Sequence, residues 1–131
     1  MKSELSIAEL DTCSRQIVLG DIGFDGQVSF RKSKVYIVGV GWLDAPSALK
    51  LTGMGIGNLR LVDRDIVSRS DLHRQYLCKA DMLGRPKVGV AVDEPMRLNP
   101  DVIFDPLAES LNPLNAEMLI EGMDYTIDGL D

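Results

Sequence analysis

The chain has 131 residues, which is enough for one domain and too few for two. Hydrophobic residues make up 45% and charged residues 26%, as in an ordinary globular protein, and no apolar run reaches the roughly 18 residues of a membrane span. The net charge of −6 disfavours unspecific binding to nucleic acid, which relies on clustered lysine and arginine. Because the N-terminus lacks a long apolar segment, we expect no signal peptide. From these properties together we expect neither a membrane nor a nucleic-acid partner, and a cytoplasmic location.

The first 33 residues are predicted to be helical. Short helices are expected at 7–10, 14–19 and 26–31, with Gly20 and Gly23 as stop signals between them.

A strand, a glycine turn, a helix and a second strand follow. Residues 34–39 are β-branched and almost continuously apolar, as in a strand that is buried on both faces of a parallel sheet. The turn at 39–44 leads into a helix at 45–54, and the second strand spans 58–63. This order predicts a βαβ unit.

The second half continues the alternation after an irregular stretch at 65–80. We expect a helix at 85–98, in which Pro86 fits the first turn and Pro95 produces a kink or an early end. The remaining elements are a strand at 102–104, a helix at 112–121 and a strand at 125–128. Strands alternating with helices predict an α/β protein with a Rossmann-like, doubly wound, mainly parallel sheet. Because the chain stops at Asp131, just past the fourth strand, we expect an incomplete sheet and a fragment of a longer chain.

The glycine turn is the first candidate binding site. In such a turn Gly39 allows the tight bend, Gly41 lets the backbone approach a phosphate, and the following helix offers free N–H groups. The third glycine of the dinucleotide fingerprint is absent, since Asp44 stands in its place. The alternative is a strand-to-helix turn that needs glycine only for its backbone angles.

Two acids follow the second strand. Asp63 comes 22 residues after Gly41 (63 − 41), close to the separation of about 20 at which a nucleotide site places its ribose-binding carboxylate. Asp65 lies two residues further on. The alternative for both is a solvated loop acid.

Two cations lie beyond the βαβ unit. Arg74 offers a planar guanidinium and Lys87 a compact ammonium, which are the groups that position a polyphosphate and neutralise its charge. The alternative for each, taken alone, is an ordinary surface charge.

Metal and thiol chemistry receive little support from the sequence. Cys13 and Cys78 form no CxxC pair, and with the single His73 they cannot supply the four ligands of a structural zinc site. We interpret both cysteines as reduced structural thiols, and His73 as a polar loop residue.

Taken together, these motifs resemble the ThiF/MoeB/ubiquitin-activating superfamily of adenylating enzymes. The resemblance covers nearly the whole chain and rests on seven motifs in the family's order: Ser14-Arg15-Gln16-Ile17, Gly39-Val40-Gly41, Leu61-Val62-Asp63-x-Asp65, Arg74-Gln75, Gly84-Arg85-Pro86-Lys87, Leu98-Asn99-Pro100 and Asp128-Gly129-x-Asp131.

The resemblance implies an adenylyltransferase. Members bind ATP with Mg²⁺ and adenylate the C-terminal Gly-Gly carboxylate of a ubiquitin-like sulfur carrier, which would be the partner of this chain. By position, Asp63 would bind the ribose, Arg74 and Lys87 the phosphates, and Asp131 the Mg²⁺. Gly39, Gly41, Asp65 and Gln75 would complete the nucleotide site.

The resemblance also implies a homodimer. Arg15 resembles the arginine that a partner subunit contributes to the phosphates. Residues 1–33 would then form a helical dimer-contact arm, and residues 34–131 the Rossmann-like core.

Three departures from the family pattern keep a second function open. Trp42 and Asp44 replace two glycines of the family's phosphate loop, and Asp71 replaces its asparagine. The Asp44 carboxylate would repel a phosphate bound at the start of the following helix. Two like charges about 4 Å apart near a protein surface cost roughly 4 kcal/mol, or about a thousandfold in affinity. The alternative is therefore a degenerate, non-catalytic relative for dimerisation or carrier binding. A nicotinamide or flavin oxidoreductase also fits the βαβ unit, but it leaves Arg74-Gln75 and Gly84-Arg85-Pro86-Lys87 unexplained.

Overall fold

The computed structural model describes residues 5–39, 44–71, 81 and 83–129. Within these residues the elements are, in chain order, α1 (Ile7–Thr12), α2 (Ser14–Ile17), α3 (Gly23–Lys32), β1 (Lys34–Val38), α4 (Asp44–Met54), β2 (Asn58–Val62), the 3-10 helix η1 (Arg69–Asp71), α5 (Lys87–Ala91), α6 (Asp93–Leu98), β3 (Ile103–Leu107), α7 (Ala116–Ile120) and β4 (Tyr125–Asp128).

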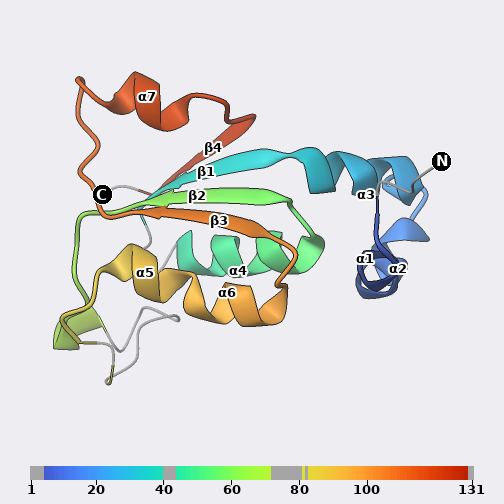
Figure 1. Cartoon of the computed structure of the whole chain (residues 1–131), viewed down its shortest axis with the longest axis horizontal. Coiled ribbons are helices and arrows are strands. Elements are labelled where there is room, and N and C mark those ends of the chain that lie inside the picture. The colour runs from blue at the N-terminus through green and yellow to red at the C-terminus, as the bar shows by residue number, and fades with distance from the viewer. Residues whose placement is uncertain (1–4, 40–43, 72–80, 82, 130–131) are drawn as a thin grey trace.

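The strands form one parallel sheet in the order β3-β2-β1-β4 (Figure 1). β1 is central and pairs with β2 on one side and with β4 on the other. This order is the first part of the doubly wound pattern, in which the strand order reverses beside the first strand. The predicted Rossmann-like class is confirmed.

Helices cover both faces of the sheet. On one face Val35, Ile37, Leu59 and Leu61 pack against the side of the molecule that holds α4, α5 and α6 (Figure 1). On the other face the smaller cluster around Tyr36, Val38 and Val62 packs against Leu119 of α7. The alternation of inward residues along β1 and β2 therefore feeds two cores, which explains why these strands are apolar throughout.

The predicted helix at 85–98 is interrupted. It begins at Lys87, because Pro86 has an extended backbone with ψ of 132°, and it divides at Val92 into α5 and α6. Pro95 has no N–H to donate to the carbonyl four residues earlier, and its ring clashes with that carbonyl. The helix is therefore interrupted at Val92, about one turn before Pro95. Pro95 itself lies in the first turn of α6.

Two other boundaries also differ from the prediction. β3 continues to Leu107 through Pro106, which is tolerated because β3 is an edge strand of the sheet and the proline need not donate to a neighbour. The helix expected from residue 112 begins only at Ala116, because Asn112 makes a turn in which its side chain accepts hydrogen bonds from the N–H groups of Leu114 and Asn115.

The N-terminal helices α1 and α2 lie beyond the amino end of the sheet, and α3 leads directly into β1 (Figure 1). α3 begins at Gly23, earlier than predicted, and its Gln27 is buried. In the described part of the chain, no helix combines the length and apolarity that crossing a bilayer requires.

Candidate functional site

The carboxyl ends of the four parallel strands meet at one edge of the sheet. The N–H of Gly39, directly after β1, donates to the carbonyl of Val62 at 2.8 Å. On the other side of β1, the N–H of Gly129 donates to the carbonyl of Val38 at 2.9 Å. Gly39 has a φ of +87°, a conformation that residues with a side chain rarely adopt. The edge between β1 and β4 is the place where open α/β sheets bind ligands.

The loop after β2 presents Asp63 and Asp65 at this same edge. The Oδ1 of Asp63 accepts a hydrogen bond from the N–H of Asp65 at 2.8 Å, which closes a short turn. Asp63 is half-buried and Asp65 is exposed. The turn holds the Asp63 carboxylate next to the end of β2.

Lys87, at the first position of α5, is brought to the two acids by the fold. Its side chain is only 9% exposed, and its Nζ lies 3.6 Å from Oδ2 of Asp65. The backbone N–H of Lys87 also donates to the carbonyl of Asp65 at 2.9 Å. Lysine is rarely buried unless it is paired, so the interpretation of Lys87 as a plain surface charge is wrong.

A backbone clasp holds the Lys87 helix against the loop after β2. The N–H of Val67 donates to the carbonyl of Arg85 at 2.9 Å, and the N–H of Gly84 donates to the carbonyl of Val67 at 3.0 Å. Ile66 and Pro86 form an antiparallel bridge beside these bonds. The clasp joins segments about twenty residues apart, and it holds Lys87 next to the loop after β2.

Several predicted site residues lie outside the described residues, and their roles stay predictions. These are Gly41, Trp42, His73, Arg74, Gln75, Cys78 and Asp131. Asp44 is the first residue of α4, and Asp71 is the last residue of η1. Among the described residues, no group of three His, Cys, Asp or Glu side chains is arranged to hold a metal. The magnesium prediction therefore depends on Asp131.

Arg15 lies at the opposite end of the molecule. It is exposed on α2, and its neighbour Gln16 donates to the carbonyl of Met54 at 3.0 Å. Met54 ends α4, whose first residue is at the carboxyl edge, so Arg15 lies near the amino edge of the sheet (Figure 1). Within one subunit the structure does not bring Arg15 to Lys87 and Asp63.

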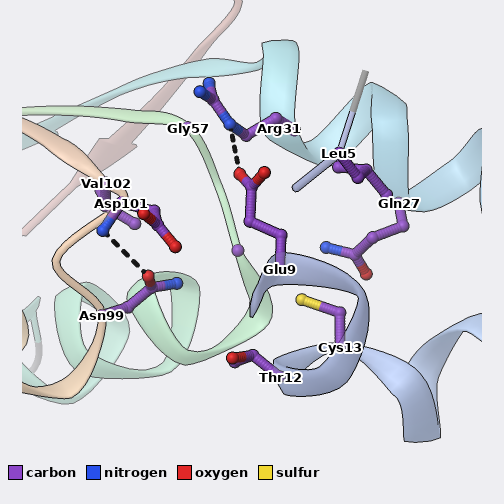
Figure 2. Close-up of a pocket in the computed structure, with 11 residues that line it drawn as sticks. Leu5, Glu9, Thr12, Cys13, Gln27, Arg31, Gly57, Asn99, Asp101 and Val102 are labelled. Carbon is purple, nitrogen blue, oxygen red and sulfur yellow. Dashed lines mark hydrogen bonds and ion pairs between the residues drawn. The ribbon is translucent and has the colours of Figure 1, made fainter. Parts of the chain in front are cut away.

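A second polar cluster surrounds a small pocket at this amino end, and the sequence analysis did not anticipate it (Figure 2). Arg31 of α3 pairs with Glu9 of α1, with 2.5 Å between Nε and Oε1. Glu9 also closes a capping box with Ser6 at the start of α1. The Ser-x-x-Glu pattern was the available signal, although it predicts only the helix start and not the ion pair.

Cys13 lines the same pocket. Its side chain is buried, and burial, together with the negative charges of Glu9 and Asp101, raises the pKa of its thiol. A high thiol pKa disfavours the thiolate that nucleophilic chemistry needs. The interpretation of Cys13 as a structural thiol agrees with this environment.

The profile of the ThiF family matches residues 13–131. The chain belongs to the ThiF family. The family match starts just before the motif that contains Arg15 and includes the carboxyl edge with Gly39, Asp63 and Lys87. The predicted resemblance is thereby confirmed.

ThiF-family relatives of known function share more than a third of the sequence. The SAMP-activating enzyme E1 of Haloferax volcanii is 36% identical over 131 residues, which are 100% of this chain and 48% of the relative. The molybdopterin-synthase adenylyltransferase of Escherichia coli is 39% identical over 129 residues, which are 98% of this chain and 52% of the relative. The chain spans about half the length of these curated relatives.

Solved ThiF-type structures have the same fold. The tRNA N6-threonylcarbamoyladenosine dehydratase TcdA of E. coli, crystallised in complex with ATP, aligns with a TM-score of 0.89 and 25% identity. The alignment covers 96% of this chain and 51% of that chain. The fold that carries a nucleotide in that enzyme is thus the fold of this chain.

Proposed function

We propose that the protein activates a ubiquitin-like sulfur carrier by adenylation with ATP. The carboxylate oxygen of the carrier's C-terminal Gly-Gly attacks the α-phosphorus of ATP, and the bond from that phosphorus to the bridging oxygen breaks. The products are an acyl-adenylate and pyrophosphate. The observation that carries the proposal is Lys87, which is buried beside the Asp63–Asp65 turn at the carboxyl edge of a ThiF-family sheet.

The proposed roles follow the chemistry of each group. Asp63 accepts hydrogen bonds from the ribose hydroxyls, and Lys87 and Arg74 neutralise the charge that grows on the leaving phosphates. Gly39 and Gly41 let the backbone approach the phosphates, while Asp65 and Gln75 complete the nucleotide site. The carrier carboxylate is already ionised at neutral pH, so the reaction needs no general base, and catalysis consists of positioning and charge stabilisation.

Magnesium is the metal that this reaction would use. Asp131 supplies the carboxylate oxygen that a hard cation prefers, and the bound ion would neutralise phosphate charge. The proposed location of the reaction is the cytoplasm.

We include a homodimer in the proposal, because Arg15 and Lys87 of one subunit lie at opposite ends of the sheet. Support comes from apolar side chains near Arg15. Val18, Leu19 and Phe24 are 80%, 54% and 43% exposed, which is unusual for large apolar residues so close together in the chain. A second copy that covers them would deliver Arg15 to the other nucleotide site.

The test is pyrophosphate exchange by the full-length protein with MgATP and a ubiquitin-like carrier that ends in Gly-Gly. Lys87→Met should weaken MgATP binding by about a hundredfold, as expected when one partner of a buried charged contact is removed. Lys50→Met, an exposed lysine of α4, is the matched control and should bind like the wild type. Absence of exchange by a dimer of confirmed mass would contradict the proposal.

A degenerate, non-catalytic relative is the second candidate, and Trp42, Asp44 and Asp71 favour it. Asp44→Asn separates the two, because asparagine keeps the size of the side chain and removes a negative charge from the first residue of α4, at the end where a phosphate would bind. If the loop still binds nucleotide, this variant should bind MgATP at least as tightly as the wild type. If the wild type binds no MgATP, the second candidate is preferred. The Trp42→Gly/Asp44→Gly double variant should then bind MgATP more tightly than the wild type if the phosphate loop is the only defect.

A further inference from the structure

Two side-chain amides, the half-buried Gln16 and the buried Gln27, join the segment that carries Arg15 to the end of α4. We propose that Gln16 and Gln27 are positioning residues, which fix the direction in which α2 presents Arg15 to a partner's nucleotide site. The inference rests on the proposed function, and it assigns a role in that function to residues at the far end of the sheet from the nucleotide.

The two amides share one acceptor. The Nε2 of Gln16 donates to the carbonyl of Met54 at 3.0 Å, and the Nε2 of Gln27 donates to the same carbonyl at 2.9 Å. The Nε2 of Gln16 also donates to Oε1 of Gln27 at 2.8 Å. Three bonds thus connect α2, α3 and the last residue of α4 in one network.

The backbone beside this network leaves space for the Gln27 side chain. Gly55, directly after Met54, has a φ of +88°, and a Cβ there would lie 2.7 Å from Nε2 of Gln27 and 3.2 Å from Sγ of Cys13. Gln27 is 1% exposed, so its amide has exchanged water for these partners. Figure 2 shows Gln27 and Cys13 beside each other at the pocket.

A second contact joins α1 and α3, the helices that precede and follow α2 in the chain. Arg31 of α3 pairs with Glu9 of α1, whose side chain is 12% exposed. α2 lies between α1 and α3 in the chain and has four residues, too few to hold its own direction as an isolated helix. Its orientation is therefore imposed by Gln16, which faces inward, while the adjacent Arg15 is exposed.

The functional consequence follows from how steeply phosphate contacts depend on geometry. Hydrogen bonds are directional, so an amide network specifies the rotation of α2 more strictly than an apolar contact of similar size. A misplacement of about 1 Å can cost about a hundredfold in rate. Loss of the network should therefore reach the nucleotide site of the other subunit.

The experiment uses full-length heterodimers purified through two different tags. One subunit carries Lys87→Ala and still donates Arg15, while the other carries Arg15→Ala and keeps Lys87. Such a dimer has one complete pocket. Gln16→Met, which keeps the length of the side chain and removes its hydrogen bonds, is then placed on either subunit. The readout is the Kd for MgATP, with the mass of the dimer and its thermal unfolding midpoint measured in parallel.

We expect the Kd for MgATP to rise by about tenfold only when Gln16→Met is on the subunit that donates Arg15, because the charged hydrogen bonds from Arg15 to the phosphates are then weakened. Both heterodimers contain the same substitutions in total, so a merely structural effect would act equally in the two arrangements. An equal loss, or no loss, would overturn the inference and leave the proposed function intact. If the parent heterodimer binds no MgATP, the proposed function itself fails and the inference with it. Gln16→Asn, which shortens the amide by one methylene, gives the same test if Gln16→Met does not assemble.

Discussion

At the residue scale, Gly55 shows how much a missing side chain can matter. Its φ of +88° and the 2.7 Å separation from Nε2 of Gln27 leave no room for a Cβ. Gly55→Ala should lower the free energy of unfolding by about 1–3 kcal/mol, because it combines backbone strain with displacement of a buried amide. Urea unfolding followed by circular dichroism measures the change.

Gly53 provides the matched control for that substitution. It lies two residues earlier, within α4, and a Cβ there would meet only Cδ2 of Leu98 at 3.5 Å, an ordinary contact. Gly53→Ala should raise the free energy of unfolding by about 0.5–1 kcal/mol through helix propensity. Equal effects of the two alanines would contradict the account of Gly55.

Glu9 makes the stability of the N-terminal segment sensitive to acid. Burial by itself raises the pKa of the Glu9 carboxyl, but hydrogen bonds from the Ser6 N–H and from Arg31, together with the Arg31 charge, lower it below its ordinary value of 4.5. A carboxyl whose folded pKa is lowered contributes stability above its unfolded pKa, and loses that contribution as the pH falls through the folded pKa.

Glu9→Gln should therefore remove part of the acid sensitivity. The variant should be less stable than the wild type at about pH 7, and the difference should shrink as the pH falls below about 4. Urea midpoints across this range measure it. Asp11→Asn, an exposed acid of the same helix, serves as the control, and the prediction fails if both variants keep the acid dependence of the wild type.

The sequence predicted which residues lie at the carboxyl edge of the sheet better than it predicted their surroundings. Gly39, Asp63 and Lys87 were expected from their motifs, and the structure brings them to one edge of the sheet. The burial of Lys87 was not predictable. It depends on the backbone hydrogen bond between Val67 and Arg85, and no local sequence pattern indicates that this bond forms. For the same reason the hydrogen-bond partners of Gln16 and Gln27 could not be predicted, because the sequence does not indicate which distant carbonyl group a glutamine side chain will contact.

At the scale of elements, Asn99 joins α4 to the turn before β3. Its side-chain Nδ2 donates to the carbonyl of Thr52 at 3.1 Å, and its Oδ1 accepts from the N–H of Asp101 at 3.2 Å. Asn99 is buried, so Asn99→Ala leaves both partners short of a hydrogen bond and should cost about 1–3 kcal/mol of the free energy of unfolding. Chemical denaturation provides the measurement.

Arg97, two residues earlier on α6, is the control. Its side chain is 72% exposed, and its pairing with Glu94 is a surface contact. Arg97→Ala should change the free energy of unfolding by no more than about 0.5 kcal/mol. If Asn99→Ala is equally mild, the bond to Thr52 does not hold α4 and α6 together.

The predicted elements agree with the observed ones where periodicity and breakers point the same way. β1, α4 and β2 were predicted almost residue by residue, because an apolar strand, a glycine turn and a helix follow one another without ambiguity. The helix at 85–98 was not, since Pro95 interrupts it one turn before its own position, at Val92. β3 was predicted too short, because the tolerance of an edge strand for Pro106 is a property of the sheet and not of the strand.

At the scale of the whole molecule, the proposed dimer predicts a sharp effect of one surface residue. Val18 is 80% exposed and lies close to Arg15 in the chain, so it belongs to the surface that a second copy would cover. Val18→Asp should place a charge in that interface and shift the protein toward the monomer, as measured by sedimentation equilibrium. MgATP binding should fall in parallel, because Arg15 is no longer delivered.

Leu114 is the control for that substitution. It is 97% exposed and precedes α7, on the other side of the sheet from α4. Leu114→Asp should leave the oligomeric state unchanged. A protein that is monomeric before any substitution and still exchanges pyrophosphate would contradict the dimer.

The strand order has a consequence for synthesis on the ribosome. β1 is a central strand, yet one of its two neighbours, β4, is the last of the four described strands to be made, and the bond from the N–H of Lys34 to Asp124 spans 90 residues. At about 5–20 residues per second, β4 emerges roughly 5–20 seconds after β1. During that interval β1 has an open edge of unpaired backbone N–H and C=O groups, with which other chains can pair. The hydrogen bonds that later bury β1 thus also define a period in which the nascent chain is most exposed to aggregation.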